Sequence, residues 1–287
     1  MSLLNSLQEI QLPTHGFQYK EFKEIEGNYV ISPSSARNFL DNRAEWKSAT
    51  IDKAKTFTGN ANTRFGSLMH LYAERYYQGK LSKEFKLSKL DLEAFFRSEP
   101  SYAMEHDSDY FDMMCTVFRN DYLKIYPQAD DIEGYIQVQI SDNILLAGSY
   151  DTLSLENDVY VLTDFKTTSS SSKDIESYYL QLAIYALALK KERGIDVGKF
   201  RIVQLVKNKQ PKVNVIEDDV KLDIPRKILN RMIFSLQDYP NLTDEQKDAY
   251  YGDNIFSFTS DTKLGVNPRV VTNEKKKIDE IKNNIFG

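Results

Sequence analysis

The sequence predicts a mixed α/β fold in which three consecutive antiparallel strands are flanked by helices. Apolar residues recur at helical spacing before residue 127, alternate with polar residues from Glu133 to Ile140, and return to helical spacing after residue 174. Of the 287 residues 41% are hydrophobic, which allows the chain to bury a substantial core. We therefore expect one domain over residues 1–287, with its core at about residues 30–240.

The part before the strands, residues 30–126, is expected to be helical. Ser32 followed by Pro33 is typical of a helix start, and this helix should run to about Trp46. Three later segments keep a helical period: 65–79, 88–98 and 107–126, the last ending before Pro127. Residues before about 28 lack a clear period and are expected to be irregular.

The middle of the chain, residues 133–217, is expected to form a sheet with one helix. The first three strands should lie at 133–140, 144–156 and 159–166. Asn157 and Asp158 tolerate the positive φ angles of a two-residue hairpin turn, which would pair Glu156 with Val159. The three strands then form an antiparallel meander.

The remaining elements follow from the same patterns. We expect a helix at 174–192 that stops at Gly194, strands at about 199–207 and 211–217, and a helix at 219–238. Residues 241–287 are polar and are expected to form an irregular tail with a short helix-like end. The lysines at 275–277 in this tail favour a solvated face over a contact with DNA phosphates.

The predicted hairpin brings together side chains that suit metal-dependent chemistry. Counting outward from its turn places Asp151 opposite Asp164 and Ser149 opposite Lys166, with these side chains on one face. Two adjacent carboxylates repel unless they share a proton or hold a divalent cation, and oxygen ligands favour Mg²⁺ or Mn²⁺. A nearby lysine can stabilise charge on a phosphate, which predicts phosphodiester hydrolysis. A plain salt-bridged ladder is the alternative for this hairpin alone.

Charge and cysteine content exclude several classes of protein. The net charge of −5 argues against a passive DNA-coating protein but is compatible with an enzyme that binds DNA in a local groove. The single cysteine, Cys115, excludes a disulfide framework and a four-cysteine cluster, and fits a reducing compartment. No apolar stretch approaches the roughly 20 residues that span a bilayer, so we expect a soluble protein.

Two helical pairs accompany the hairpin. Gly66 and His70 are four residues apart on the helix at 65–79, so a close approach at the glycine would leave the imidazole free to face a metal. Gln181 and Tyr185 have the same spacing on the helix that follows the third strand. Taken singly, each pair also fits an ordinary structural role.

Together these segments resemble the RecB-like branch of the PD-(D/E)XK nucleases over roughly residues 30 to 210. The resemblance is carried by five motifs in order: Ser32-Pro33-Ser34-Ser35, Gly66-X-X-X-His70, Gly148-X-X-Asp151, Asp164-Phe165-Lys166-Thr167 and Gln181-Leu182-X-X-Tyr185. It implies a restriction-endonuclease-like core, with a central mixed sheet flanked by helices and an additional helical segment at the N-terminus.

The resemblance also implies roles for individual residues. His70, Asp151, Asp164 and the backbone carbonyl of Phe165 would bind Mg²⁺, for which Mn²⁺ can substitute, and Lys166 would be the catalytic lysine. Gln181 and Tyr185 would line the site and help hold the lysine or DNA. Glu133, at the start of the first strand, would support a second ion.

Within this branch the sequence favours a stand-alone exonuclease of the kind used in phage recombination and replication. Cys115 alone cannot hold the iron–sulfur cluster of some relatives, and no phosphate-binding loop of a helicase motor is present. The implied partner is DNA, with a single-strand annealing or replication protein as a second partner, in a bacterial cytoplasm or a phage-infected cell. Two alternatives stay open: a catalytically silent DNA- or protein-binding module, and a structure- or sequence-specific endonuclease.

Overall fold

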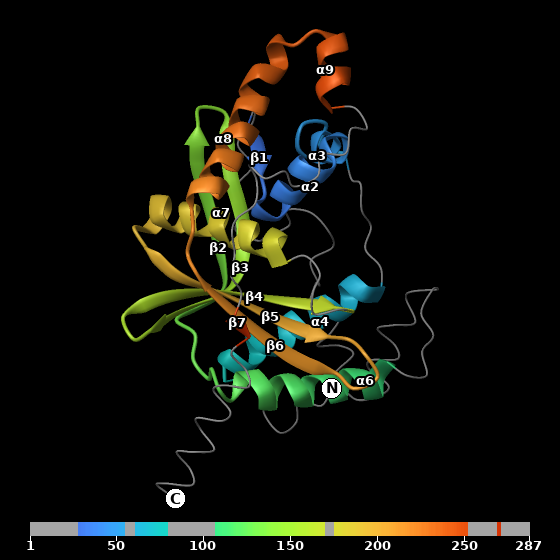
Figure 1. The fold of residues 1–287 in the computed structure, drawn as a ribbon, viewed down its shortest axis with the longest axis vertical. Helices are drawn as coiled ribbons and strands as arrows, with labels where there is room; N and C mark the ends of the chain where they lie inside the picture. Colours follow the sequence, from blue (N-terminus) through green and yellow to red (C-terminus); the bar gives the residue numbers. More distant parts are fainter. Residues whose placement is uncertain (1–27, 55–60, 80–106, 170–174, 252–268, 271–287) are drawn as a thin grey trace, which may run out of the picture.

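The computed structural model describes residues 28–54, 61–79, 107–169, 175–251 and 269–270. These residues form one mixed sheet with helices on both of its faces (Figure 1). The predicted fold class is therefore confirmed. Within the described residues no helix is long and apolar enough to cross a membrane.

The sheet has seven strands, six of which follow the order β1-β3-β4-β5-β6-β7, while β2 pairs with β3. Their bounds are β1 Tyr29–Ile31, β2 Asp131–Ser141, β3 Ile144–Glu156, β4 Val159–Thr168, β5 Val197–Val206, β6 Lys212–Asp219 and β7 Arg269–Val270. The pairs β1–β3 and β4–β5 are parallel and the others are antiparallel.

The expected meander of β2, β3 and β4 is confirmed. Asn157 and Asp158 have φ angles of 50° and 63°, the left-handed values that the turn requires, and Glu156 pairs with Val159. The register continues as predicted only as far as Thr152 and Thr163.

The next two predicted pairs, Asp151 with Asp164 and Ser149 with Lys166, are not part of this ladder. The reason lies along one edge of β3, where β1 pairs with residues 144–146 and β4 with residues 152–156. Between these stretches, residues 147–151 pair with neither β1 nor β4. The sheet therefore splits beside Asp151.

Each face of the sheet carries its own apolar core. One face is covered by α2 (Ala36–Asp41), α7 (Ile175–Arg193) and α8 (Asp223–Asp238), which pack around side chains such as Leu162 and Ile202. The other face is covered by α4 (Ala61–Tyr77) and α6 (Asp107–Phe118), which pack on Phe165 and Val203. Residues of β4 thus alternate between the two cores, as a strand buried on both faces should.

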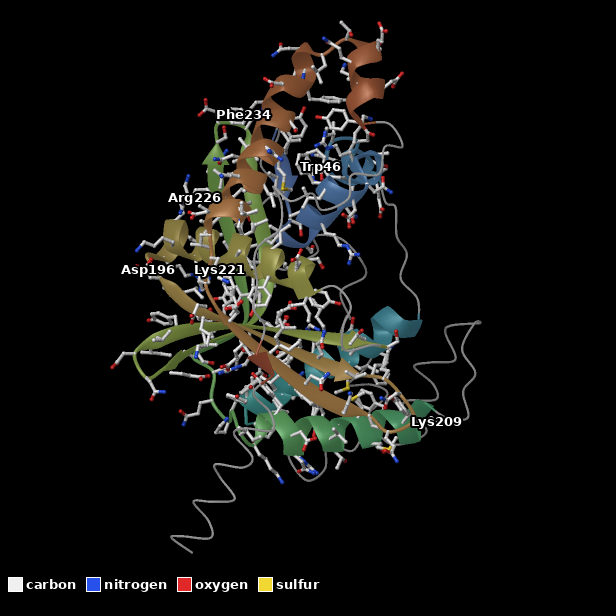
Figure 2. The ribbon with its side chains drawn as sticks, in the orientation of Figure 1. Trp46, Asp196, Lys209, Lys221, Arg226 and Phe234 are labelled. Carbon is white, nitrogen blue, oxygen red and sulfur yellow. The ribbon has the colours of Figure 1, made fainter. Side chains whose placement is uncertain are left out.

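Several expected elements differ in detail. The helix predicted to run to Trp46 is divided into α2 and α3 (Arg43–Thr50), because the Asn42 side chain accepts a hydrogen bond from the Glu45 backbone at 3.1 Å and caps a new helix. Trp46 itself is fully buried in the core above the sheet (Figure 2). The π-helical turn η2 (Arg119–Leu123) replaces the end of the helix expected at 107–126.

The tail expected to be irregular from residue 241 instead contains α9 (Asp244–Tyr251). Thr243 and Gln246 form reciprocal caps, in which each backbone N–H donates to the other side chain, at 2.8 and 3.2 Å. A short 3-10 turn, η3 (Tyr239–Asn241), joins α8 to this helix. The helix expected at 88–98 and the lysines at 275–277 lie outside the described residues.

Candidate metal and catalytic site

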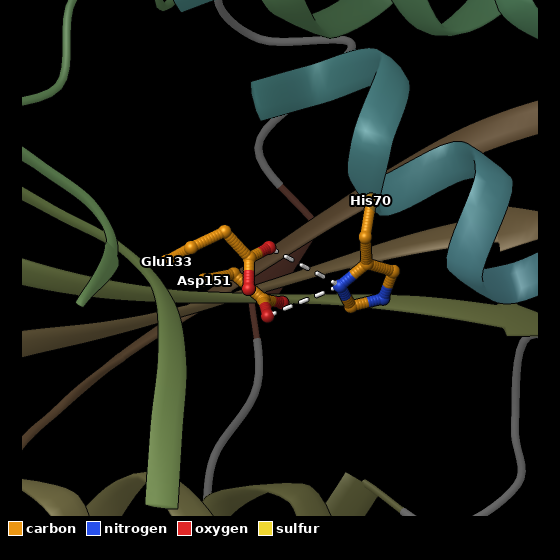
Figure 3. A group of neighbouring side chains, drawn as sticks. All are labelled: His70, Glu133 and Asp151. Atoms are coloured by element: carbon orange, nitrogen blue, oxygen red, sulfur yellow. Dashed lines mark ion pairs between the residues drawn. The ribbon is translucent and has the colours of Figure 1, made fainter. Parts of the chain in front are cut away.

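Helix α4 presents His70 to the divided sheet. Its Nδ1 lies 3.1 Å from Asp151 Oδ1 and 3.8 Å from Glu133 Oε1, so the imidazole faces a carboxylate on β3 and another on β2 (Figure 3). One ligand atom from each of the three residues lies within 4.8 Å of the other two. One imidazole nitrogen and two carboxylates form a donor set that suits Mg²⁺ or Mn²⁺.

Close packing at Gly66 brings α4 against β4. A Cβ atom at this position would lie 3.2 Å from the Thr167 side-chain oxygen, so a larger residue would press the helix away from the strand. The predicted purpose of the glycine, a close approach one turn before His70, is therefore what the structure contains. The Phe165 ring then packs edge-on to His70 at 6.1 Å between ring centres.

Glu133 reaches the site through an unusual backbone conformation. Its φ angle is +49° near the start of β2, a left-handed value that costs a residue other than glycine on the order of 1 kcal/mol. Its neighbours Ile132 and Gly134 keep regular register with Thr152 and Tyr150, so the distortion is confined to one residue. This single residue carries the second of the two carboxylates that face His70.

Asp164 and Lys166 form an ion pair on the β4 side of the site. Lys166 Nζ lies 2.7 Å from Asp164 Oδ1 and 5.4 Å from the centre of the Tyr178 ring on α7. The second oxygen, Asp164 Oδ2, is buried and has no hydrogen-bond donor among the described residues. A buried carboxylate oxygen without a donor is costly, and a cation at this point would satisfy it.

The site brings charged side chains close together, and two of them, Asp151 and Asp164, are buried. Burial together with the charge of Asp151 raises the pKa of Asp164 to about 6, although Lys166 acts in the opposite direction. Burial would lower the pKa of His70, but the carboxylates of Asp151 and Glu133 raise it well above its ordinary value. Burial and the charge of Asp151 also raise the pKa of Glu133, whereas His70 and Lys166 keep the pKa of Asp151 below its ordinary value. A divalent cation would offset the repulsion among these carboxylates.

Other predicted site residues lie on α7 and β4. Tyr185 is buried and its hydroxyl donates to the Ser149 carbonyl, so it contacts the stretch of β3 that pairs with neither β1 nor β4. Gln181 is half-buried one turn earlier, and among the described residues its side chain makes no hydrogen bond to Lys166. Phe165 donates its backbone N–H to Asp151 Oδ2.

Two residues near the site were not predicted. Tyr178, whose ring lies beneath Lys166, is seven residues before Tyr185, a spacing that places both on one side of a helix and could have identified it. Gln204 is the register partner of Lys166 on β5, is fully buried, and has neither amide atom hydrogen-bonded within the described part of the chain. Its strand pattern gave no signal for this.

The fold of the chain is similar to that of known structures. A protein from Eubacterium rectale, provisionally described as an exonuclease, matches with a TM-score of 0.50 and 16% identity over 89% of this chain and 90% of its own. SSO0001 matches with a TM-score of 0.33 and 12% identity over 84% of this chain and 87% of its own, a likeness too weak to support an argument.

Comparison of the sequence with curated proteins gives no significant match. The family model of the PD-(D/E)XK nuclease superfamily, by contrast, matches residues 30–259, a span that contains all the elements described above except β7 and the first residue of β1. This span also includes the divided sheet and every side chain of the candidate site. The chain therefore belongs to the PD-(D/E)XK nuclease superfamily.

Proposed function

We propose that this protein is a Mg²⁺-dependent deoxyribonuclease that hydrolyses phosphodiester bonds, acting as an exonuclease at DNA ends. The observation that carries the proposal is the meeting of His70, Glu133 and Asp151 beside the Asp164–Lys166 pair, with Asp164 Oδ2 lacking a donor among the described residues. Divalent metals are the cofactors of this superfamily, and the donor set fits Mg²⁺ or Mn²⁺.

His70, Asp151, Asp164 and the Phe165 carbonyl would hold the ion, with Glu133 as a further ligand. A bound Mg²⁺ supplies Lewis-acid polarisation of the scissile phosphate and lowers the pKa of water. The chain contributes carboxylates and a lysine that its own ion pairs already hold in place, which would orient the phosphate for attack. Gln181, half-buried on α7, would contact the lysine or the DNA when substrate is present.

Lys166 would act on the phosphate itself. Asp164, with a side chain only 5% exposed, holds the ammonium at 2.7 Å, and Tyr178 supports it from α7. Burial would lower the pKa of Lys166, but the carboxylates of Asp164 and Asp151 raise it, so the side chain stays charged. It can therefore stabilise the negative charge that develops on the phosphate as water attacks and the leaving oxygen departs.

The test is hydrolysis of end-labelled linear DNA with Mg²⁺. We expect Asp164→Ala and Lys166→Ala to reduce kcat by about 10²-fold or more without unfolding the protein. Lys47→Ala is a matched control, because Lys47 also lies 2.7 Å from a carboxylate and is exposed to a similar extent, but its partner Asp52 is exposed whereas Asp164 is buried. Metal-dependent hydrolysis that survives both site substitutions would overturn the assignment.

The exonuclease part of the proposal is supported by the description of the Eubacterium rectale structure and by the RecB-like motif order. Linear and covalently closed circular DNA, each single- and double-stranded, separate the choices. An exonuclease degrades only the linear forms, whereas an endonuclease also opens the circles. A catalytically silent module would cut none of them and would show no Asp151-dependent Mn²⁺ binding by calorimetry.

A further inference from the structure

The end of α7 is joined to the strand that carries Glu133 by a compact hydrogen-bonded cluster. Arg193, the last residue of the helix, donates from Nη1 to Asp131 Oδ2 at 2.8 Å and to the Tyr150 hydroxyl at 3.0 Å. Its Nη2 donates to the Tyr135 carbonyl at 2.6 Å. The Tyr150 hydroxyl also donates to Asp131. The Arg193 guanidinium therefore binds to residues of both β2 and β3.

These hydrogen bonds lie close in the chain to the two candidate metal ligands Glu133 on β2 and Asp151 on β3. Asp131 and Tyr135 lie two residues before and two residues after Glu133, the one residue of β2 with a left-handed φ angle. Tyr150 immediately precedes Asp151. A single arginine therefore fixes the chain on both sides of one carboxylate and directly beside the other.

The packing beneath Arg193 leaves little freedom for another arrangement. A Cβ atom at Gly134 would lie 2.2 Å from the Tyr150 ring, so the ring fills the space next to the Glu133 distortion. The Gln137 backbone N–H donates a further hydrogen bond to the Glu192 carboxylate at 3.2 Å. Without the bonds to Arg193, Glu133 could relax to the extended conformation that its neighbours have, which would turn its carboxylate away from His70.

We propose that Arg193 is a positioning residue of the metal site, which holds Glu133 and Asp151 in the geometry that binds a divalent ion. This inference rests on the proposed function, because it needs these carboxylates to be ligands. Partners that orient metal ligands typically change metal affinity by 10–100-fold when they are removed. Arg193 differs from such partners only in that it acts through the backbone and the Tyr150 ring.

The test is Mn²⁺ binding to the full chain, measured by calorimetry, with unfolding by urea in EDTA as an independent measure of stability. We expect Arg193→Gln to weaken Mn²⁺ binding about tenfold. Tyr150→Phe, which removes one hydroxyl but keeps the ring against Gly134, should weaken it less. The control is Lys190→Gln, which removes an ion pair with Asp196 just beyond the same helix end (Figure 2) and should leave Mn²⁺ binding unchanged.

Arg193 would be a purely structural residue if Arg193→Gln lowered stability in EDTA but left the Mn²⁺ affinity at the wild-type value, and that result would overturn the inference. Should Arg193→Gln fail to fold, an unchanged affinity in Tyr150→Phe and in Asp131→Asn would overturn it equally. Failure of the proposed function looks different, because the wild-type protein itself would then show no Mn²⁺ binding that depends on Asp151.

Discussion

The backbone N–H of Phe165 donates a hydrogen bond to the carboxylate of Asp151, and this bond stands where the β3–β4 ladder has ended. The other oxygen of the same carboxylate faces His70 on α4 at 3.1 Å. Asp151 therefore connects β3, β4 and α4 at the point where the sheet divides. One oxygen of Asp151 thus has a structural role and the other faces the candidate metal site. Substitutions of Asp151 can distinguish the two roles.

Asp151→Asn and Asp151→Ala should differ in stability when metal is absent. Asparagine keeps an oxygen that can accept from Phe165, whereas alanine leaves that buried N–H without an acceptor, at a cost of about 1–3 kcal/mol. We expect urea unfolding in EDTA to give a lower free energy for alanine than for asparagine, while calorimetry shows weakened Mn²⁺ binding for both. Equal stabilities would mean that the Phe165 bond contributes nothing to the fold.

Asp164 should make the stability of the metal-free protein depend on pH. Its pKa in the folded protein is about 6, above the ordinary value of 3.8, so the folded state holds a proton that the unfolded chain has lost. The stabilisation from this group is fully present below about pH 4 and is lost as pH rises through about 6.

We expect the free energy of unfolding of the wild-type protein, relative to Asp164→Asn, to fall by roughly 1–3 kcal/mol between about pH 4 and pH 6 in EDTA. The difference between the two proteins removes the contribution of groups that titrate in both. Urea unfolding at intervals across this range measures it, and a difference that stays constant or rises with pH contradicts the raised pKa.

The packing of Gly148 against Tyr185 should appear as an energetic coupling. A Cβ atom at Gly148 would lie 2.8 Å from the Tyr185 hydroxyl oxygen and 3.1 Å from Pro33, so Gly148→Ala should destabilise the protein by about 1–3 kcal/mol. Tyr185→Phe removes the oxygen that the new methyl group meets, and the double variant should lose less stability than the two single variants together. Strict additivity would show that the chain moves elsewhere instead.

Much of the site was predictable from local sequence, whereas the features that were not predicted depend on contacts between residues far apart in the chain. Asn157 and Asp158 specify the hairpin and its register, and Gly66 with His70 specifies how α4 meets β4. The division of the sheet was not predictable, because it depends on β1, three residues that pair with a segment more than a hundred positions away. The pairs Asp151–Asp164 and Ser149–Lys166 were extrapolated across that division and were wrong for this reason.

Two other differences had signals in the sequence. Asn42 with Glu45, and Thr243 with Gln246, both have the spacing of a helix cap and would have divided the first helix and placed α9. The left-handed backbone at Glu133 had none, because glutamate has no preference for that conformation. Such a conformation is set by its surroundings, here Tyr150 and Arg193, and not by the residue itself.

Gln204 should be a residue whose removal stabilises the protein. It is fully buried beside Lys166 on the next strand, and both its amide nitrogen and its oxygen lack hydrogen bonds to the described residues. Each such group costs about 1–3 kcal/mol, and methionine has a similar shape without the polar atoms. We expect Gln204→Met to raise the free energy of unfolding in urea by about 1 kcal/mol or more.

Ser235→Ala provides the contrast, because the Ser235 hydroxyl is buried but donates to the Arg231 carbonyl at 2.8 Å. That variant should show no comparable gain. If Gln204→Met instead lowers stability, the amide has a partner such as a buried water molecule, which a high-resolution crystal structure would reveal beside Lys166. A higher free energy of unfolding for Gln204→Met, with no increase for Ser235→Ala, would show that the unsatisfied Gln204 amide destabilises the protein. Selection for stability alone would remove such an amide, so its presence beside the proposed catalytic lysine would then point to a role other than stability.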